Sequence, residues 1–270
     1  MNILFIGGGN MAAAIIGGLV AKGWPVASLH AVDVMPDALS RLERRFGIGT
    51  SADGAAASAA ADCIVLAVKP QQMREVAAAL APVLKKQLVI SIAAGIRGSD
   101  LVRWLGATAQ IVRAMPNTPA LVAAGITGLY AMPGISPAQR RDAENILTAV
   151  GTTFWVDRES DLDAVTAVSG SGPAYVFYFI EALEQAGREL GLSPDIARQC
   201  AQATFAGAIK LAAGDGADPA TLRAQVTSKG GTTERAIAAL DDADVKAAFI
   251  RAVRAAAERS AELGAALGKD

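Results

Sequence analysis

ILFIGGGNMA, residues 3–12, joins a short apolar run to a glycine-rich turn and then to a helical pattern. Gly7, Gly9 and Ala12 have the spacing of the loop that binds a dinucleotide after the first strand of a Rossmann-type domain. The glycines permit a tight turn and a close approach to a pyrophosphate, and the free amides at Asn10 and Met11 favour phosphate. The stretch predicts a site for NAD(H) or NADP(H), and a glycine turn without a ligand is the alternative.

The first half of the chain continues to alternate short apolar runs with longer helical patterns. This alternation predicts βαβ units and a mostly parallel sheet, and the unbroken apolar run 64–68 is typical of a strand covered on both faces. The expected strands are residues 3–6, 29–33, 63–68, 88–92, 110–113, 126–131 and 153–156. The expected helices are residues 11–22, 36–46, 55–61, 71–84 and 99–105, with another that starts near Ser136.

The sequence changes in character near residues 157–161, beyond which it contains no convincing strand pattern. Helical patterns cover residues 174–190, 194–213, 220–226, 232–240 and 245–267, with glycine and proline turn signals between them. We therefore expect an α/β protein with an N-terminal Rossmann-type dinucleotide-binding domain, residues 1–160, followed by an all-α domain, residues 161–270. The apolar face of segment 245–267 needs a partner, which predicts a dimer formed through the C-terminal domain.

Composition and charge argue against several classes of protein. Of the 270 residues 52% are hydrophobic, but the apolar runs are much shorter than the roughly 20 residues that cross a bilayer. A net charge of −1 with scattered lysine and arginine gives no basic patch for nucleic acid. Cys63 and Cys200 predict buried free thiols, and with no leader pattern at the N-terminus we expect a cytoplasmic protein. His30 is the only histidine and no cluster has metal-ligand spacing, so no metal site is expected.

Two charged residues follow expected strands, at the sheet edge where open α/β sheets bind ligands. Asp33 ends the run that starts at residue 29, where a carboxylate binds the ribose 2′-hydroxyl of NAD(H) and disfavours the 2′-phosphate of NADP(H). Arg41, Arg44 or Arg45 is near enough in sequence to reach back, so the preference for NADH is slight. A turn or capping role is the alternative for Asp33, and a surface position is the alternative for Lys69.

The chain resembles the pyrroline-5-carboxylate reductase family along essentially its whole length. The matching blocks are IGGGNMA (6–12), AVKP (67–70), SIAAG (91–95), RAMPNTP (113–119), SGSGPAY (169–175) and VTSKGGTT (226–233). The first block is common to many dehydrogenases, whereas the last three, in this order and spacing, are specific to the family.

The resemblance implies hydride transfer from NAD(P)H to the carbon–nitrogen double bond of 1-pyrroline-5-carboxylate, which yields L-proline. It implies a C-terminal helical dimerisation domain, interlocked dimers that often assemble into decamers, and an active site completed by the partner chain. In the family, the loop matching residues 228–231 receives the substrate carboxylate, and the threonine matching Thr233 faces the ring nitrogen. The stretch matching Ala67, Val68, Lys69 and Pro70 lies along the cofactor.

The residues of the last block have the chemistry that this substrate needs. Gly230 and Gly231 expose amides, the start of the following helix favours negative charge, and Ser228 adds a hydroxyl; Thr232 is assigned to the substrate with them. The Thr233 hydroxyl is a weak acid, so we expect it to orient the ring nitrogen more than to act as a strong general acid. A plain N-cap at Ser228 with a glycine turn is the alternative.

Two further residues are assigned on their positions in the family blocks. Ser171 lies where glycines permit close approach at the start of a long helix, and is assigned to the substrate, with a plain interdomain turn as the alternative. Asn117 lies between Pro116 and Thr118 and is assigned to the nicotinamide side of the coenzyme, with a turn-forming asparagine as the alternative.

Three other functions are weighed against this one. A two-domain hydroxyacid dehydrogenase uses a lysine with asparagine four residues later, but Lys210 is followed by Gly214 at that spacing. A regulatory protein that binds NAD(P) without catalysis is disfavoured by the intact block at residues 226–233. Reduction of a related cyclic imine acid, such as one with a six-membered ring, is the third alternative.

Overall fold

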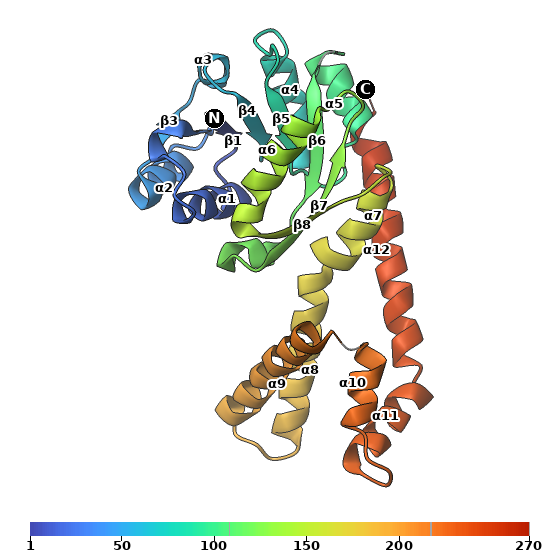
Figure 1. Ribbon diagram of the computed structural model, residues 1–270. Helices are drawn as coiled ribbons and strands as arrows, with labels where there is room; N and C mark the ends of the chain where they lie inside the picture. Colours follow the sequence, from blue (N-terminus) through green and yellow to red (C-terminus); the bar gives the residue numbers. More distant parts are fainter. Residues whose placement is uncertain (108, 217, 270) are drawn as a thin grey trace. The chain divides into compact units, whose positions relative to one another are not determined.

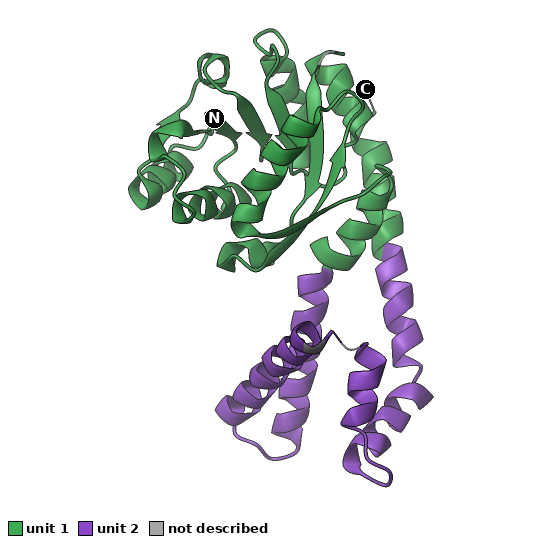
Figure 2. Cartoon of the chain, viewed as in Figure 1, with its two compact units in different colours: residues 1–171, 256–270 green, residues 172–255 purple. Residues whose placement is uncertain are grey.

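A computed structural model describes residues 1–107, 109–216 and 218–269 (Figure 1). The chain divides into two compact units, residues 1–171 with 256–270 and residues 172–255 (Figure 2). The sequence predicts a boundary near residue 160 and one continuous second domain. The compact units differ from that division in two places, because the first unit extends to residue 171 and also includes the last part of the chain. Side chains explain the return of the last helix to the first unit: the Ser260 hydroxyl donates to Asp163 Oδ1 at 2.7 Å, and Arg103 donates to the Gly268 carbonyl.

The first unit contains an eight-stranded sheet in the order β3-β2-β1-β4-β5-β6-β7-β8. All neighbouring strands are parallel except β6 and β7, which are antiparallel. The strand order reverses between β1 and β4, and open α/β sheets bind ligands at the carboxyl ends of the strands at such a point. The strands are β1 (Ile3–Ile6), β2 (Leu29–Val32), β3 (Gly49–Ser51), β4 (Cys63–Leu66), β5 (Leu88–Ser91), β6 (Gln110–Met115), β7 (Gly125–Ala131) and β8 (Gly151–Trp155).

Helices cover both faces of this sheet, which explains why its central strands are apolar throughout. Neighbouring residues of β1 enter opposite cores: Phe5 packs with α1, α2 and α6, whereas Leu4 packs with α4 and α5. The helices of this unit are α1 (Asn10–Ala21), α2 (Pro36–Phe46), α3 (Gly54–Ala59), α4 (Met73–Leu80), α5 (Gly98–Leu105), α6 (Pro137–Leu147) and α7 (Asp161–Val165) (Figure 1). No helix in the described part of the chain combines the length and apolar character needed to cross a membrane.

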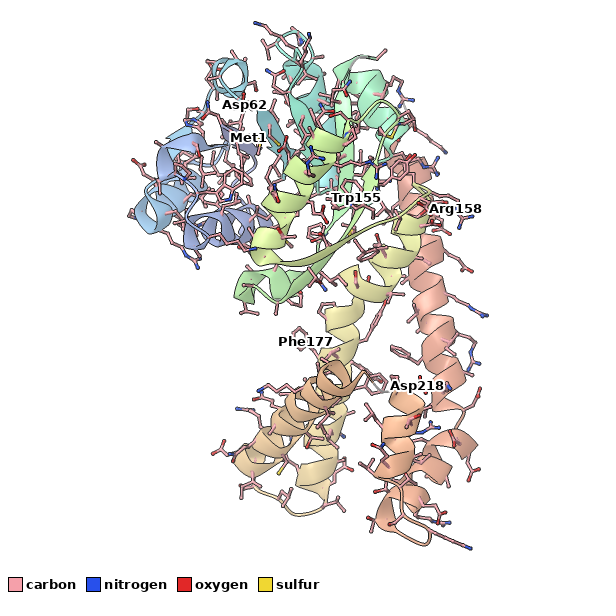
Figure 3. All side chains as sticks on the ribbon, viewed as in Figure 1. Met1, Asp62, Trp155, Arg158, Phe177 and Asp218 are labelled. Carbon is pink, nitrogen blue, oxygen red and sulfur yellow. The ribbon has the colours of Figure 1, made fainter. Side chains whose placement is uncertain are left out.

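The second unit is helical and buries little of its own apolar surface. It contains α8 (Gly172–Glu189), α9 (Pro194–Asp215), α10 (Pro219–Gln225), α11 (Thr232–Asp242) and the first part of α12 (Val245–Leu267). Among its described residues only Ala197 and Ala201 are buried, in α9, while Phe177 of α8 is 65% exposed (Figure 3). Helices with this much exposed apolar surface need further packing partners.

The predicted α/β fold with a helical C-terminal region is confirmed, and one of the described strands and one of the described α-helices were missed. β3 has the sequence Gly-Thr-Ser, with no apolar run that would predict a strand. Its pairing with β2 at the edge of the sheet makes it a strand. α7 occupies part of the stretch that the sequence indicates as a boundary, and its acidic first turn, Asp161 with Asp163, gives little apolar periodicity.

Candidate active site

The glycine-rich loop joins β1 to α1 at the point where the strand order reverses. Gly7 has φ +104°, and its amide donates to the Val32 carbonyl of β2 at 2.8 Å. A Cβ at Gly7 would lie 2.7 Å from the carbonyl carbon and oxygen of Ala67, just after β4. Glycine is therefore required at this position by backbone conformation and by the close approach of the neighbouring strand.

Asp33 lies directly beside this loop, as its position after β2 predicts. Its Oδ2 accepts a hydrogen bond from the Gly8 amide at 2.6 Å, and its Oδ1 accepts one from the Met35 amide at 2.8 Å. Each carboxylate oxygen keeps a lone pair for a further donor. Asp33 thus has the turn role that the sequence leaves open, and retains acceptors for a ribose hydroxyl.

The start of α1 fits a dinucleotide phosphate. Its N-cap is Gly9, so no side chain caps the first amides, and its first turn contains no acidic residue. A Cβ at Gly9 would meet nothing within 4 Å, so the backbone is open to an approaching group. Asn10 is exposed and Met11 half-buried at this end of the helix. The free amides and the helix dipole together favour an anion here.

The segment after β4 borders the same edge of the sheet. The Ala67 amide donates to the Ile6 carbonyl at 2.8 Å, which places residue 67 next to the loop. Val68 is half-buried, Lys69 is exposed, and Pro70 begins a short 3-10 helix, Pro70–Gln72. The structure therefore brings all the predicted coenzyme residues except Asn117 together around β1, β2 and β4.

Asn117 has two protein partners. Its Oδ1 accepts from the Ile126 amide at 3.0 Å, its Nδ2 donates to the Ser169 carbonyl at 3.2 Å, and the residue is 8% exposed. The side chain therefore holds the start of β7 and the segment that contains Ser169. The geometry favours this positioning role over a direct side-chain contact to nicotinamide.

Ser171 follows a π-helical segment, Thr166–Gly170, that connects α7 to α8. Its amide donates to the Thr166 carbonyl at 2.8 Å, so the segment is helical and is not the plain turn considered from the sequence. Gly170 lies against Met115, since a Cβ there would be 2.5 Å from the methionine methyl group. π-helical insertions of this kind occur often at functional sites.

The other predicted group, in the second unit, forms the turn before α11. Gly230 has φ +73°, Gly231 is the N-cap of α11, and no side chain caps the helix. No hydrogen bond is found within the described chain for the hydroxyl groups of Ser228, Thr232 and Thr233. The turn thus presents these hydroxyls next to the uncapped first amides of α11, a combination that favours an anion.

Glu234 is a residue of this turn that the sequence analysis missed. Its Oε2 accepts from the Gly230 amide at 2.6 Å, so that amide is already used within the protein. The Gly231 amide is also used, since it donates to the Ser228 carbonyl at 3.0 Å. Only the first amides of α11 itself therefore remain to donate to a substrate carboxylate, contrary to the expectation that both glycines expose amides. An acidic residue three positions after an N-cap is the sequence signal that predicts such a contact.

The remaining reactive groups lie outside both loops. His30 hydrogen bonds Ser51 at 2.9 Å between β2 and β3, and burial lowers its pKa. Burial raises the pKa of the Cys63 thiol well above its ordinary range, whereas Cys200 is exposed, contrary to the expectation of two buried thiols. The exception arises because Cys200 lies on a side of α9 that its unit leaves uncovered, whereas Ala197 and Ala201 of the same helix are buried. Among the described residues no three metal-binding side chains come together.

Comparison with known proteins identifies the family. Residues 159–263 match the family model for pyrroline-5-carboxylate reductase dimerisation, and residues 2–95 match that of the coenzyme F420-dependent NADP oxidoreductases. The pyrroline-5-carboxylate reductase of Pseudomonas aeruginosa is 47% identical over 269 residues, covering 99% of this chain and 98% of the relative. The chain belongs to the pyrroline-5-carboxylate reductase family.

Other members of the family agree with this assignment. The pyrroline-5-carboxylate reductase of Pasteurella multocida is 42% identical, with 97% of each chain covered. The structure of the Coxiella burnetii reductase matches with a TM-score of 0.92 and 42% identity, over 97% of this chain and 98% of that one. The Plasmodium falciparum reductase with NADP bound matches with a TM-score of 0.88 and 28% identity, over 98% of each chain.

Proposed function

We propose that this chain reduces the carbon–nitrogen double bond of 1-pyrroline-5-carboxylate to give L-proline, with NAD(P)H as the coenzyme. The observation that carries the proposal is the turn before α11. A glycine N-cap there leaves the first amides of the helix free, and the Thr233 hydroxyl has no hydrogen-bond partner among the described residues. A cyclic imine with a carboxylate needs an anion site and a polar group facing its nitrogen, and this turn supplies both in one short segment.

The coenzyme supplies the hydride when it is bound. We assign its pyrophosphate to the loop of Gly7 and Gly9, where Asn10 and Met11 offer amides at the start of α1. Asp33 is assigned to the adenine ribose, and the segment from Ala67 to Pro70 borders the same crevice. Asn117 acts by fixing the backbone around Ser169.

The substrate is assigned to the second unit. The amides at the start of α11 and the hydroxyls of Ser228 and Thr232 receive the carboxylate, and Ser171 is assigned to the same substrate. Thr233 orients the ring nitrogen and holds the proton that the nitrogen carries or receives. The Gly230 amide does not contact the carboxylate in this proposal, because Glu234 occupies it.

We also propose a cytoplasmic homodimer formed through the helical unit, with decamers as the family's further assembly. Support comes from the dimerisation model that matches residues 159–263 and from the exposed apolar surface of α8. Phe177 and Tyr178 are 65% and 68% exposed there, which is unusual for neighbouring aromatic residues. Light scattering on the purified protein measures the dimer and the decamer directly.

The Thr233→Ala variant tests the assignment of the catalytic turn. We expect turnover to fall at least about tenfold, because the ring nitrogen loses an oriented hydroxyl, while the Kd for NADPH stays within about twofold. Thr233→Ser keeps the hydroxyl and is the matched control, with near-native turnover expected. Near-native turnover in Thr233→Ala would remove Thr233 from the mechanism.

The substrate ring size is tested with the same assay. Oxidation of NADH and NADPH is followed over a range of concentrations of 1-pyrroline-5-carboxylate and of the six-membered cyclic imine acid. We expect a higher kcat/KM for the five-membered ring. The reverse order would support the related-imine alternative, and no oxidation with either imine would support a regulatory NAD(P)-binding protein.

A further inference from the structure

A cleft of about 460 Å³ opens beside the glycine-rich loop, between the start of α1 and the side of α2. It is lined by Gly8 and Gly9 and by three arginines, Arg41, Arg44 and Arg45, with no acidic residue in the lining. Guanidinium groups and free amides both donate hydrogen bonds to phosphate oxygens. The lining therefore has the chemistry of a phosphate-binding surface.

Structural roles account for two of these arginines but not for the third. Arg44 and Arg45 lie in the last turn of α2, where a cation interacts favourably with the helix dipole, and Arg45 also stacks 4.9 Å from the ring centre of Phe46. Arg41 lies in the middle of α2. Within the described residues it forms no hydrogen bond or ion pair, although Asp37 lies one turn earlier. Arg41 is thus available to a ligand.

The position of Arg41 places it near the ribose end of the coenzyme site. The Asp33 carboxylate, which hydrogen bonds the Gly8 amide at 2.6 Å, occupies the position that faces the adenine ribose in this fold. A Cβ at Gly8 would lie 3.3 Å from Ala38 and 3.2 Å from Leu42, so this face of α2 packs against the loop. Arg41 lies one turn after Ala38 and beside Leu42, at the edge of that face.

We propose that Arg41 binds the 2′-phosphate of NADPH, and so lets the chain use NADPH although Asp33 disfavours that phosphate. The inference rests on the proposed coenzyme site at the glycine-rich loop. A carboxylate after β2 favours the free 2′-hydroxyl of NADH, whereas a guanidinium forms bidentate, charge-assisted hydrogen bonds with phosphate. Asp33 therefore favours NADH, and Arg41 favours NADPH.

Binding of ADP-ribose and of 2′-phospho-ADP-ribose to the full chain tests this role, because the ligands differ only in the 2′-phosphate. By calorimetry, we expect Arg41→Ala to weaken 2′-phospho-ADP-ribose at least about tenfold, the effect of losing one charge-assisted hydrogen bond. ADP-ribose should stay within about twofold. Arg141→Ala removes the same charge from an exposed position in α6, outside the cleft lining, and is the matched control, with both affinities within about threefold.

The outcomes separate this inference from the coenzyme site itself. An Arg41→Ala variant that keeps the native ratio of the two affinities would overturn the inference. An equal loss of affinity for both ligands would also overturn it, because Arg41 would then hold the pyrophosphate. An equal effect of Arg141→Ala would overturn it as well, because it would indicate general charge attraction. If the native chain bound neither ligand, the coenzyme site at the glycine-rich loop would itself be wrong.

Discussion

Gly7 and Gly9 are two residues apart in one loop, and the structure gives them different roles. Gly7→Ala should destabilise the first unit, whereas Gly9→Ala should leave its stability nearly unchanged and weaken coenzyme binding. The reason lies in what a methyl group would meet at each position. At Gly7 it meets backbone atoms of Ala67 at 2.7 Å, and at Gly9 it meets nothing within 4 Å.

The expected loss of stability in Gly7→Ala has two parts. A non-glycine residue held at φ +104° carries strain of about 1–3 kcal/mol. Forcing a methyl group against backbone that β1 and β4 hold in register adds about 1–3 kcal/mol more. The sum, about 2–6 kcal/mol, is a large fraction of the 5–15 kcal/mol that typically stabilises a protein.

Gly9 has φ −73° and ψ −177°, a conformation that alanine adopts without strain. We expect a change in stability of no more than about 1 kcal/mol, because alanine is a poorer N-cap than glycine but reduces the entropy of the unfolded chain. Its methyl group would stand where the pyrophosphate approaches the backbone. The affinity for ADP-ribose should fall at least about tenfold.

Urea unfolding followed by tryptophan fluorescence is suited to this comparison. Trp24, Trp104 and Trp155 all lie in the first unit, so the signal reports the unit that contains the loop. Calorimetry with ADP-ribose then measures the coenzyme site separately. The reasoning fails if Gly7→Ala unfolds at the native urea midpoint, or if Gly9→Ala loses as much stability as Gly7→Ala.

Two further predictions concern Glu234 and Cys63. Glu234→Ala should raise the KM for the imine about tenfold, because the Gly230 amide loses its charged acceptor. Glu234→Gln keeps an acceptor, so its KM should be close to the native value. Equal KM values in the two variants would contradict this role of Glu234. In a Cys200→Ser background, stability should fall above pH 9.0, the ordinary pKa of the thiol, by about 1.4 kcal/mol per pH unit, because burial raises the pKa of Cys63 only in the folded state. Urea midpoints that show the same pH dependence after a further Cys63→Ala change would refute it.

The central strands and their helices could be predicted because their apolar pattern is a direct consequence of burial. β1 and α2 were located to the residue, since each has an apolar pattern bounded by glycine or proline. β3 could not be found, because edge pairing with β2 rather than an apolar run holds it. The antiparallel pairing of β6 with β7 likewise depends on contacts between segments and leaves no signal in either strand alone.

The conformation of the glycine-rich loop was predicted more fully than the contacts that support it. The backbone conformation at position 7 requires glycine, and a requirement for one residue type can be recognised from the sequence. The partners of Asn117 are backbone groups of Ile126 and Ser169, and nothing local in the sequence names them. The position of Glu234, three residues after the N-cap, predicts a capping contact. The carboxylate accepts from the amide of Gly230, one residue before the N-cap, and not from the amide of the N-cap itself.

Helix capping distinguishes the two helices that begin with glycine from four helices that begin with a capping side chain, while α2, α4, α5 and α7 begin with other residues and also lack a side-chain cap. α3, α6, α9 and α10 begin with Asp53, Ser136, Ser193 and Asp218, and each side chain accepts a hydrogen bond from the first turn of its helix. α1 and α11 begin with glycine and have no side-chain cap. A cap fills the acceptor position that an anion would take, so a helix that binds one must leave it open. The two glycine-capped helices carry the two loops assigned to the pyrophosphate and to the substrate carboxylate, which is the arrangement that a reductase of a carboxylated imine requires.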